Sequence, residues 1–277
     1  MFLIADFIVS SRTKLFMKKN IIAGLGEIGT PILQLISKNA ISVGYDINKN
    51  LMNEKIFKKN EKLETEILHI CIPFSNKFIT NVISLYSKFT PELIVIHSTV
   101  SPYTTKKIQV NLPIPVIYSA TRGVHKRMLR DLKRYEKFFA IEDSAPDKEQ
   151  ACSKFESLMK NSGVKTKRLS NPVTLELAKI ICDTSYYGWL ITYAQLSNMI
   201  AREHHVDYDE MWSFSDEIHK FLGNRPKMFP GFIGGHCVIP NLDLIHNQTL
   251  DLIKTINNQY VKKVRNAKTL AKKYQKK

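Results

Sequence analysis

The segment from Gly24 to Gly29, with the sequence GLGEIG, constrains the fold of this chain more than any other feature. It follows a short apolar run and precedes a helical pattern over residues 30–38. In such a unit the first glycine permits a tight turn, the second lets the backbone approach a pyrophosphate, and the third lets helix and strand pack closely. The free N–H groups of the helix N-terminus attract phosphate. The segment therefore predicts a unit that binds a dinucleotide.

Short apolar runs alternate with amphipathic stretches over the first 165 residues. Six runs rich in Ile and Val begin at residues 21, 41, 67, 93, 114 and 137. Helical patterns over 30–38 and 76–89 lie between the early runs. Such alternation is typical of a doubly wound sheet. We expect an α/β fold with a mostly parallel Rossmann sheet, followed by a helical domain.

The pattern changes after residue 165. Pro172 is placed to begin a helix, and residues 173–203 contain no Gly or Pro except Gly188. A helix of that length would span about 46 Å, so we expect it to pack against its copy in a homodimer. Further helices are predicted over 207–222 and 247–272. The predicted domains are an N-terminal extension (1–16), an NAD-binding Rossmann domain (17–165), a helical substrate and dimerisation domain (166–261) and a basic tail (262–277).

Composition limits the partners that the chain can have. It carries 41 Lys and Arg against 25 Asp and Glu, but eight of the basic residues lie within 262–277. Because the excess is concentrated in one tail, we expect an anionic small molecule rather than nucleic acid as partner. The four cysteines form no C-x-x-C pair, so no disulfide framework and no metal site are predicted. No apolar run reaches the roughly 18 residues of a membrane span, and we expect a cytoplasmic protein without membrane attachment.

A second predicted strand ends in Asp46, twenty residues after Gly26. A carboxylate there accepts both ribose hydroxyls and repels the 2′-phosphate of NADP, so the predicted cofactor is NAD. Ligands lie beyond the carboxyl ends of parallel strands, which places Pro73 and Thr99 at the same edge. The alternative is a glycine turn with no ligand. The predicted cofactor-binding residues are Gly24, Leu25, Gly26, Glu27, Ile28, Gly29, Asp46 and Pro73.

The loop over residues 230–241, PGFIGGHCVIPN, is the most informative stretch for chemistry. It combines two glycines that allow close approach of a substrate, an imidazole, the thiol of Cys237 and a proline that stiffens the exit. A thiolate beside positive charge is a good nucleophile toward an aldehyde. A tight turn with a buried cysteine is the alternative, because buried thiols are common.

Two further groups of charged residues are candidates. Glu176, Lys179 and Asp183 share one face of the predicted long helix. Lys179 either polarises a substrate hydroxyl and stabilises an oxyanion, or forms an ordinary surface ion pair with Asp183. Arg122 and His125 follow the fifth apolar run in a basic segment, which either clamps an anionic substrate or is simply solvated.

Four segments resemble, in the same order, the UDP-glucose/GDP-mannose (nucleotide-sugar) 6-dehydrogenase family: GLGEIG, HSTVSPYTT, LELAKIICD and PGFIGGHCVIPN. The resemblance covers about residues 17–260. It implies an NAD-dependent enzyme of polysaccharide biosynthesis that oxidises a sugar C6 alcohol to an aldehyde or acid through a cysteine adduct. The catalytic residues that it implies are Cys237, Lys179, Asp183 and Thr99. The predicted substrate-binding residues are Arg122, His125, Gly234, Gly235, His236 and Asn241.

The chain departs from the pattern of that family at several positions. The asparagine four residues after the lysine is Asp183. The Pro-Glu pair after the fifth strand is Ala120-Thr121, so the glutamate linked to thioester hydrolysis is replaced. The aspartate four residues beyond the cysteine is Asn241, with Asp243 nearby. The chain stops where family members begin a third domain that helps to grip the nucleotide.

Two other hypotheses stay open. A dehydrogenase of the β-hydroxyacid type shares the strand–glycine–helix start and a similar lysine pair on a helix, and it needs no cysteine. An acid substrate that consumes one NAD per molecule would favour it. A degenerate NAD-binding subunit without chemistry would explain the missing glutamate, and tight NAD binding without turnover would favour that hypothesis.

Overall fold

The chain divides into two compact units, Met1–Gln195 and Leu196–Lys277, each described by itself. The first unit continues past residue 165 because a seventh strand and the helix that follows it pack on the sheet. The predicted extension (1–16) and the loop over 223–241 lie outside the described residues. The computed structural model describes residues 17–185, 197–198, 200–222, 248, 251–255, 257–259 and 261–262.

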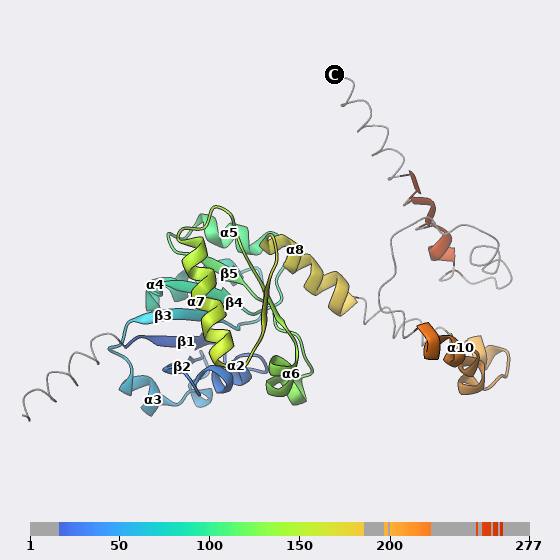
Figure 1. The fold of residues 1–277 in the computed structure, drawn as a ribbon, viewed down its shortest axis with the longest axis horizontal. Coiled ribbons are helices and arrows are strands. Elements are labelled where there is room, and N and C mark those ends of the chain that lie inside the picture. Colours follow the sequence, from blue (N-terminus) through green and yellow to red (C-terminus); the bar gives the residue numbers. More distant parts are fainter. Residues whose placement is uncertain are drawn as a thin grey trace, which may run out of the picture. The chain divides into compact units, whose positions relative to one another are not determined.

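Seven strands of the first unit form one sheet in the order β2-β1-β3-β4-β5-β6-β7 (Figure 1). Neighbouring strands are parallel except β5 and β6, which are antiparallel. The mostly parallel α/β sheet predicted from the apolar runs is therefore confirmed. The strands are β1 (Lys19–Ala23), β2 (Ser42–Tyr45), β3 (Thr65–Ile70), β4 (Leu93–Ile96), β5 (Val116–Tyr118), β6 (Lys137–Ile141) and β7 (Thr166–Arg168).

Helices cover both faces of the sheet, so the unit has three layers (Figure 1). One face packs against α2 (Gly29–Ile36), α6 (Met128–Arg134) and α7 (Lys148–Asn161). The other packs against α3 (Glu54–Lys59), α4 (Phe78–Phe89), α5 (Thr104–Val110) and α8 (Pro172–Leu177). The central strands are apolar on both sides because both sides are covered. The 3-10 turns are η1 (Lys49–Leu51) and η2 (His125–Arg127), and a π-helix, η3, covers Ala178–Ser185.

Two features of this unit differ from the sequence-based expectation. Strand β7 has no apolar run, because its residues are Thr, Lys and Arg and lie at the half-exposed margin of the sheet. A helix begins at Pro172, as predicted, and its α-helical part ends at Leu177. The Asn171 side chain caps its start by accepting a hydrogen bond from the Thr174 N–H at 2.9 Å. The helix continues as the wider π-helix η3, a form often found at functional sites. Residues 186–196 of the predicted long helix lie outside the described residues.

The described part of the second unit is helical. Helix α10 (Tyr208–Leu222) matches the helix predicted over 207–222. The Asp207 carboxylate accepts a hydrogen bond from the Glu210 N–H at 2.7 Å at its start, as expected of a helix N-cap. Trp212 Nε1 donates to Ser197 Oγ at 3.2 Å and ties α10 to the preceding helical turn. Across the residues that the structure describes, no helix has the length and apolar character of a membrane span.

Candidate functional site

A cavity of about 890 Å³ opens at the carboxyl edge of β1, β2, β3 and β4. In open parallel sheets this edge is where ligands bind. Six of the eight predicted cofactor-binding residues contribute to its wall: Gly24, Gly26, Glu27, Ile28, Asp46 and Pro73. Ser98 and Thr99, which follow β4, also line the cavity. The structure thus brings six of the eight predicted cofactor residues and Thr99 to one cavity, whereas Leu25 and Gly29 do not line it.

The three glycines of the first turn have different geometric roles. Gly24 has φ +93°, and a Cβ there would meet the Cys71 backbone at 2.8 Å. A Cβ on Gly29 would lie 1.7 Å from the carbonyl oxygen of Gly24, so only glycine lets α2 pack this close to β1. A Cβ on Gly26 would meet no atom within 4 Å. Gly26 therefore leaves its space to the cavity, where a pyrophosphate fits against the start of α2.

Asp46 follows β2 and lies at the wall of the same cavity. Its Oδ2 accepts a hydrogen bond from the Leu25 N–H at 2.7 Å, and its Oδ1 accepts one from the Asn48 N–H at 2.8 Å. These two bonds fix the carboxylate beside the glycine turn. Each oxygen keeps a second lone pair for a ribose hydroxyl, so the residues present fit the ribose of a dinucleotide.

Cys71, which ends β3, lies in the cavity wall but is a poor nucleophile. Its side chain is 8 % exposed, and burial raises the pKa of its thiol to about 12. At neutral pH the thiol is protonated, and the thiolate is the reactive form. Ser98 Oγ donates to the Ile72 carbonyl at 2.6 Å and ties the ends of β3 and β4 together. Both side chains shape the cavity rather than carry chemistry.

Lys179 and Asp183 form an ion pair on η3. Lys179 Nζ lies 2.5 Å from Asp183 Oδ2, and the lysine side chain is 13 % exposed. In the described part of the chain neither residue lines the cofactor cavity. Glu176, on the same helix, caps α5: its carboxylate accepts from the Thr105 N–H at 2.9 Å and from the Tyr103 N–H at 2.6 Å. Glu176 is thus a structural residue.

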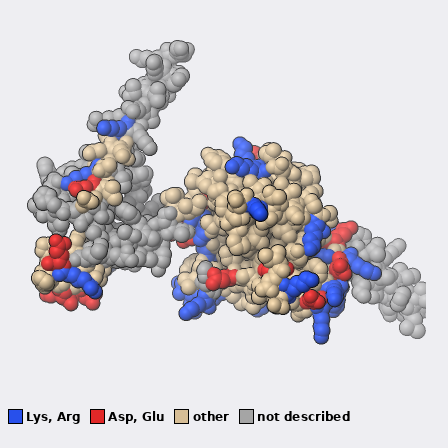
Figure 2. Space-filling model, turned by 180° about the vertical axis from the view of Figure 1, so that it is seen from behind, with Lys and Arg blue, Asp and Glu red and all other residues tan. Residues whose placement is uncertain are grey.

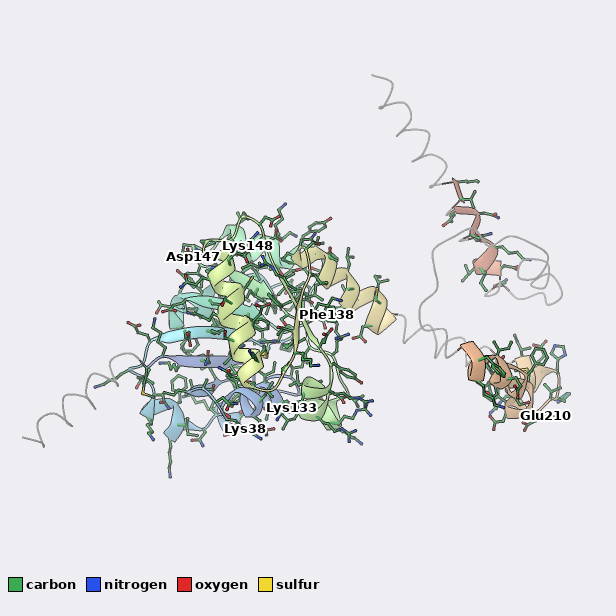
Figure 3. All side chains as sticks on the ribbon, in the orientation of Figure 1. Lys38, Lys133, Phe138, Asp147, Lys148 and Glu210 are labelled. Atoms are coloured by element: carbon green, nitrogen blue, oxygen red, sulfur yellow. The ribbon has the colours of Figure 1, made fainter. Side chains whose placement is uncertain are left out.

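Arg122 begins a tightly organised segment after β5. Its guanidinium donates to the Glu136 carbonyl at 2.6 Å and lies 4.8 Å from the centre of the Phe138 ring. Phe138 belongs to β6 (Figure 3). Asp131 of α6 holds the rest of the segment, because it accepts from the Val124 N–H at 3.0 Å. Arg122 is therefore anchored to β6 in this structure. The side chain of His125 lies outside the described residues.

The edge also carries a cluster of buried polar residues, of which the sequence singled out only Thr121. Lys137, the first residue of β6, is 5 % exposed, and Thr121 beside it is also 5 % exposed. His69 and His97 are fully buried on β3 and after β4, with Nδ1 of His69 2.9 Å from Nε2 of His97. Because these residues lie within or beside apolar runs, the sequence pattern gives no sign that they are buried together. A lysine at the start of a buried strand next to a strand-end histidine is the signal that could have found them.

The remaining predicted residues fall in parts of the chain that the structure does not describe. These are Gly234, Gly235, His236, Cys237 and Asn241. In the described ranges no group of three or more His, Cys, Asp or Glu side chains could hold a metal ion. Figure 2 shows the described Lys and Arg side chains of one face in several separate places, some beside acidic ones.

Comparison with known proteins relates this chain to others by fold. No family model matches the sequence, and no curated protein sequence matches it. Among solved structures, a UDP-D-ManNAc dehydrogenase from Pyrococcus horikoshii is similar with a TM-score of 0.61 and 19 % identity over 87 % of this chain and 68 % of its own.

Two further solved structures are similar over most of their length. An imine reductase from Myxococcus stipitatus in complex with NAD+ has a TM-score of 0.60 and 11 % identity, covering 89 % of this chain and 94 % of its own. A 3-hydroxyisobutyrate dehydrogenase from Mycobacterium tuberculosis has a TM-score of 0.55 and 14 % identity with the same coverage. At these identities the likeness shows the fold, which is the α/β Rossmann-like fold of dehydrogenases and reductases.

Proposed function

We propose that this chain is an NAD-dependent oxidoreductase that oxidises the C6 alcohol of a sugar or nucleotide sugar to an aldehyde or acid through an adduct on Cys237. One observation carries the cofactor part of the proposal. The glycine turn leaves open space at Gly26 on the wall of a large cavity, and the fixed carboxylate of Asp46 lies on the same wall. This combination suits the pyrophosphate and ribose of NAD.

In this proposal different residues of the chain bind the cofactor ring, stabilise the substrate oxygen and form the adduct. Bound NAD would supply a hydride acceptor. Thr99 and Pro73 would border the reacting ring from the ends of β4 and β3. The Lys179 ammonium, held by Asp183, would stabilise the substrate oxygen as its proton leaves to water and a hydride leaves the neighbouring carbon. The thiol of Cys237 would then add to the aldehyde carbon.

The resemblance of the chemistry-bearing segments favours a nucleotide sugar as substrate, and the fold likeness to a UDP-D-ManNAc dehydrogenase supports the same class. An anionic substrate also suits the net charge of +16. In this proposal Arg122, His125 and the loop over 234–241 bind the substrate, and residues 173–203 pair two subunits. Size-exclusion chromatography tests the pairing.

Turnover of UDP-N-acetylmannosamine with NAD tests the proposal. Reduced NAD is followed by its absorbance, and wild type is compared with Lys179→Met and with Lys148→Met. Lys148 is a matched control because it lies at the start of α7 and pairs with Asp143, at the opposite edge of the sheet. The proposal predicts loss of turnover in Lys179→Met alone. Equal rates in all three proteins would contradict the role of Lys179.

A dehydrogenase of the β-hydroxyacid type is the second candidate. The chain covers 94 % of a 3-hydroxyisobutyrate dehydrogenase, so the two are similar in extent. Lys179 is the expected catalytic lysine in this candidate too, but Cys237 has no role. Wild type that oxidises 3-hydroxyisobutyrate, together with an equally active Cys237→Ser variant, would favour it. Tight NADH binding without oxidation of either substrate would favour a non-catalytic subunit.

A further inference from the structure

Lys137 lies at the carboxyl edge of the parallel strands although it begins a strand. The reason is that β6 is antiparallel to β5, with Tyr118 opposite Ala140. Continuing this register by three residues brings Lys137 opposite Thr121. The lysine Nζ donates to the Ser119 carbonyl at 3.0 Å and to Thr121 Oγ1 at 3.4 Å. The contact therefore joins the beginning of β6 to the segment that leaves β5.

The direction of these hydrogen bonds orients the Thr121 hydroxyl. While Lys137 carries its proton, its ammonium group only donates, so Thr121 Oγ1 accepts from it. The hydrogen of the same hydroxyl must then point elsewhere, and the described residues give it no acceptor. A hydroxyl that accepts from a cation is a better donor, because hydrogen bonds in a chain polarise one another.

The Ser119 carbonyl that accepts from Lys137 also contacts His97, and His97 in turn contacts His69. His97 Nδ1 lies 3.2 Å from the Ser119 carbonyl oxygen, which can only accept, so Nδ1 carries the hydrogen. His97 Nε2 is then an acceptor and takes the Nδ1–H of His69 at 2.9 Å. Burial keeps both rings neutral, lowering the pKa of His69 to about 3 and that of His97 well below its usual range. The arrangement fixes the Ser119 carbonyl, and with it Lys137.

Among the residues that the structure describes, no carboxylate pairs with Lys137. The groups of the described chain that act on it are the Cys71 thiol, the Arg122 guanidinium and the Lys179 ammonium. Cys71 lines the cofactor cavity, and Lys179 is the proposed partner of the substrate oxygen. Buried charges in proteins are usually paired, and a buried lysine whose charged neighbours in the described chain include the cations Arg122 and Lys179 points to a role in the site. Lys137 interacts electrostatically with both Cys71 and Lys179 and contacts Thr121, so Thr121 lies at the same edge of the sheet as these groups.

We propose that Lys137 is a positioning residue that makes the Thr121 hydroxyl a hydrogen-bond donor to an oxygen of the substrate. The proposal rests on the proposed function, because it requires an alcohol oxidised at this edge. Thr121 stands where the resembling family has a glutamate, so the chain replaces an acceptor with a donor. The donor would hold the alcohol oxygen and the aldehyde oxygen formed from it, adding to the Lys179 charge.

A double-mutant cycle tests this proposal. Lys137→Met and Thr121→Val are close in shape to the residues they replace and are made singly and together, with Lys148→Met as control. The measured quantity is kcat/KM with UDP-N-acetylmannosamine and NAD. Each single variant is expected to lose about 10-fold to 100-fold, and the double variant should lose no more than Thr121→Val alone. NADH affinity should stay within twofold in all, because the cavity wall is untouched.

The outcomes separate this inference from the proposed function. Losses that multiply in the double variant would overturn the positioning role, because two independent defects multiply. Full activity in Thr121→Val would overturn it as well. The pH dependence of kcat/KM distinguishes the positioning role of Lys137 from a merely structural one. The wild-type value should change near neutral pH as Lys137 titrates, and the Lys137→Met value should not. If wild type oxidises neither UDP-N-acetylmannosamine nor 3-hydroxyisobutyrate, the proposed function fails, and the inference fails with it.

Discussion

Replacing Lys137 by methionine has a stability effect that can be worked out from the structure. Burial of the side chain, which is 5 % exposed, lowers the pKa of its ammonium from 10.5 to about 7. A difference of about 3.5 pKa units corresponds to roughly 5 kcal/mol. Between pH 7 and 10.5 the unfolded chain keeps a proton that the folded chain has released. The free energy of unfolding of wild type therefore rises with pH in this window, by at most about 1.4 kcal/mol per pH unit.

Methionine has a similar length and no charge, so the variant does not have the free-energy cost of burying an ammonium group at any pH. It also removes two hydrogen bonds, each of which contributes about 1 kcal/mol. The variant should be about 3 kcal/mol more stable than wild type at pH 6, and the difference should vanish near about pH 9. The Ser119 carbonyl keeps its bond from His97 in the variant, so no buried carbonyl is left without a donor.

Guanidinium unfolding followed by far-ultraviolet circular dichroism at several pH values between 6 and 9.5 measures this difference. Subtracting the free energy of unfolding of wild type from that of Lys137→Met cancels the contributions of the other titrating groups. Lys148→Met controls for the loss of a surface lysine. A difference that stays constant with pH would refute the buried, weakly basic lysine. A variant less stable than wild type at pH 6 would refute it too.

Three further predictions follow from individual contacts. Gly29→Ala should destabilise the first unit by several kcal/mol in chemical unfolding, because its Cβ would collide with the carbonyl of Gly24; unchanged stability would contradict the close packing. Asp46→Asn should lower the NADH-to-NADPH affinity ratio in fluorescence titrations by about 10-fold, because the charge that repels a 2′-phosphate is gone; an unchanged ratio would argue against its place at the ribose. Oxidation of UDP-N-acetylmannosamine should show a burst of about two NADH per subunit followed by a slower steady rate, because Thr121 has no carboxylate to activate the water that hydrolyses the thioester; a linear time course without a burst would show that another group supplies the base.

The first part of the fold could be predicted because its signals are local. Apolar runs of Ile and Val predicted six strands, and all six occur in the sheet. The glycine turn and Asp46 predicted one wall of the cavity, because their roles follow from backbone geometry and from where β1 and β2 end. Strand β7 could not be predicted, because its Thr, Lys and Arg residues form a strand by pairing with β6 and are not buried.

The buried edge group needed tertiary information. Lys137 precedes a run of aromatic residues, and its sequence neighbours give no sign that it is buried. Only the antiparallel pairing of β6 brings it beside Thr121 and Ser119. The change to a π-helix at Ala178 is likewise invisible to a pattern of apolar spacing. The roles of Cys237 and its loop stay predictions.

NADH titration of wild type, Gly26→Val and Asp143→Ala tests the central claim most directly. A Cβ at Gly26 would meet no described atom within 4 Å and Gly26 lines the cavity, whereas Asp143 is a surface carboxylate that pairs with Lys148. Wild type and Asp143→Ala should bind NADH with the same affinity, and Gly26→Val should lose binding at least 10-fold while keeping its unfolding midpoint. Equal NADH affinity in all three proteins, or none in wild type, would contradict the claim that this cavity holds the cofactor.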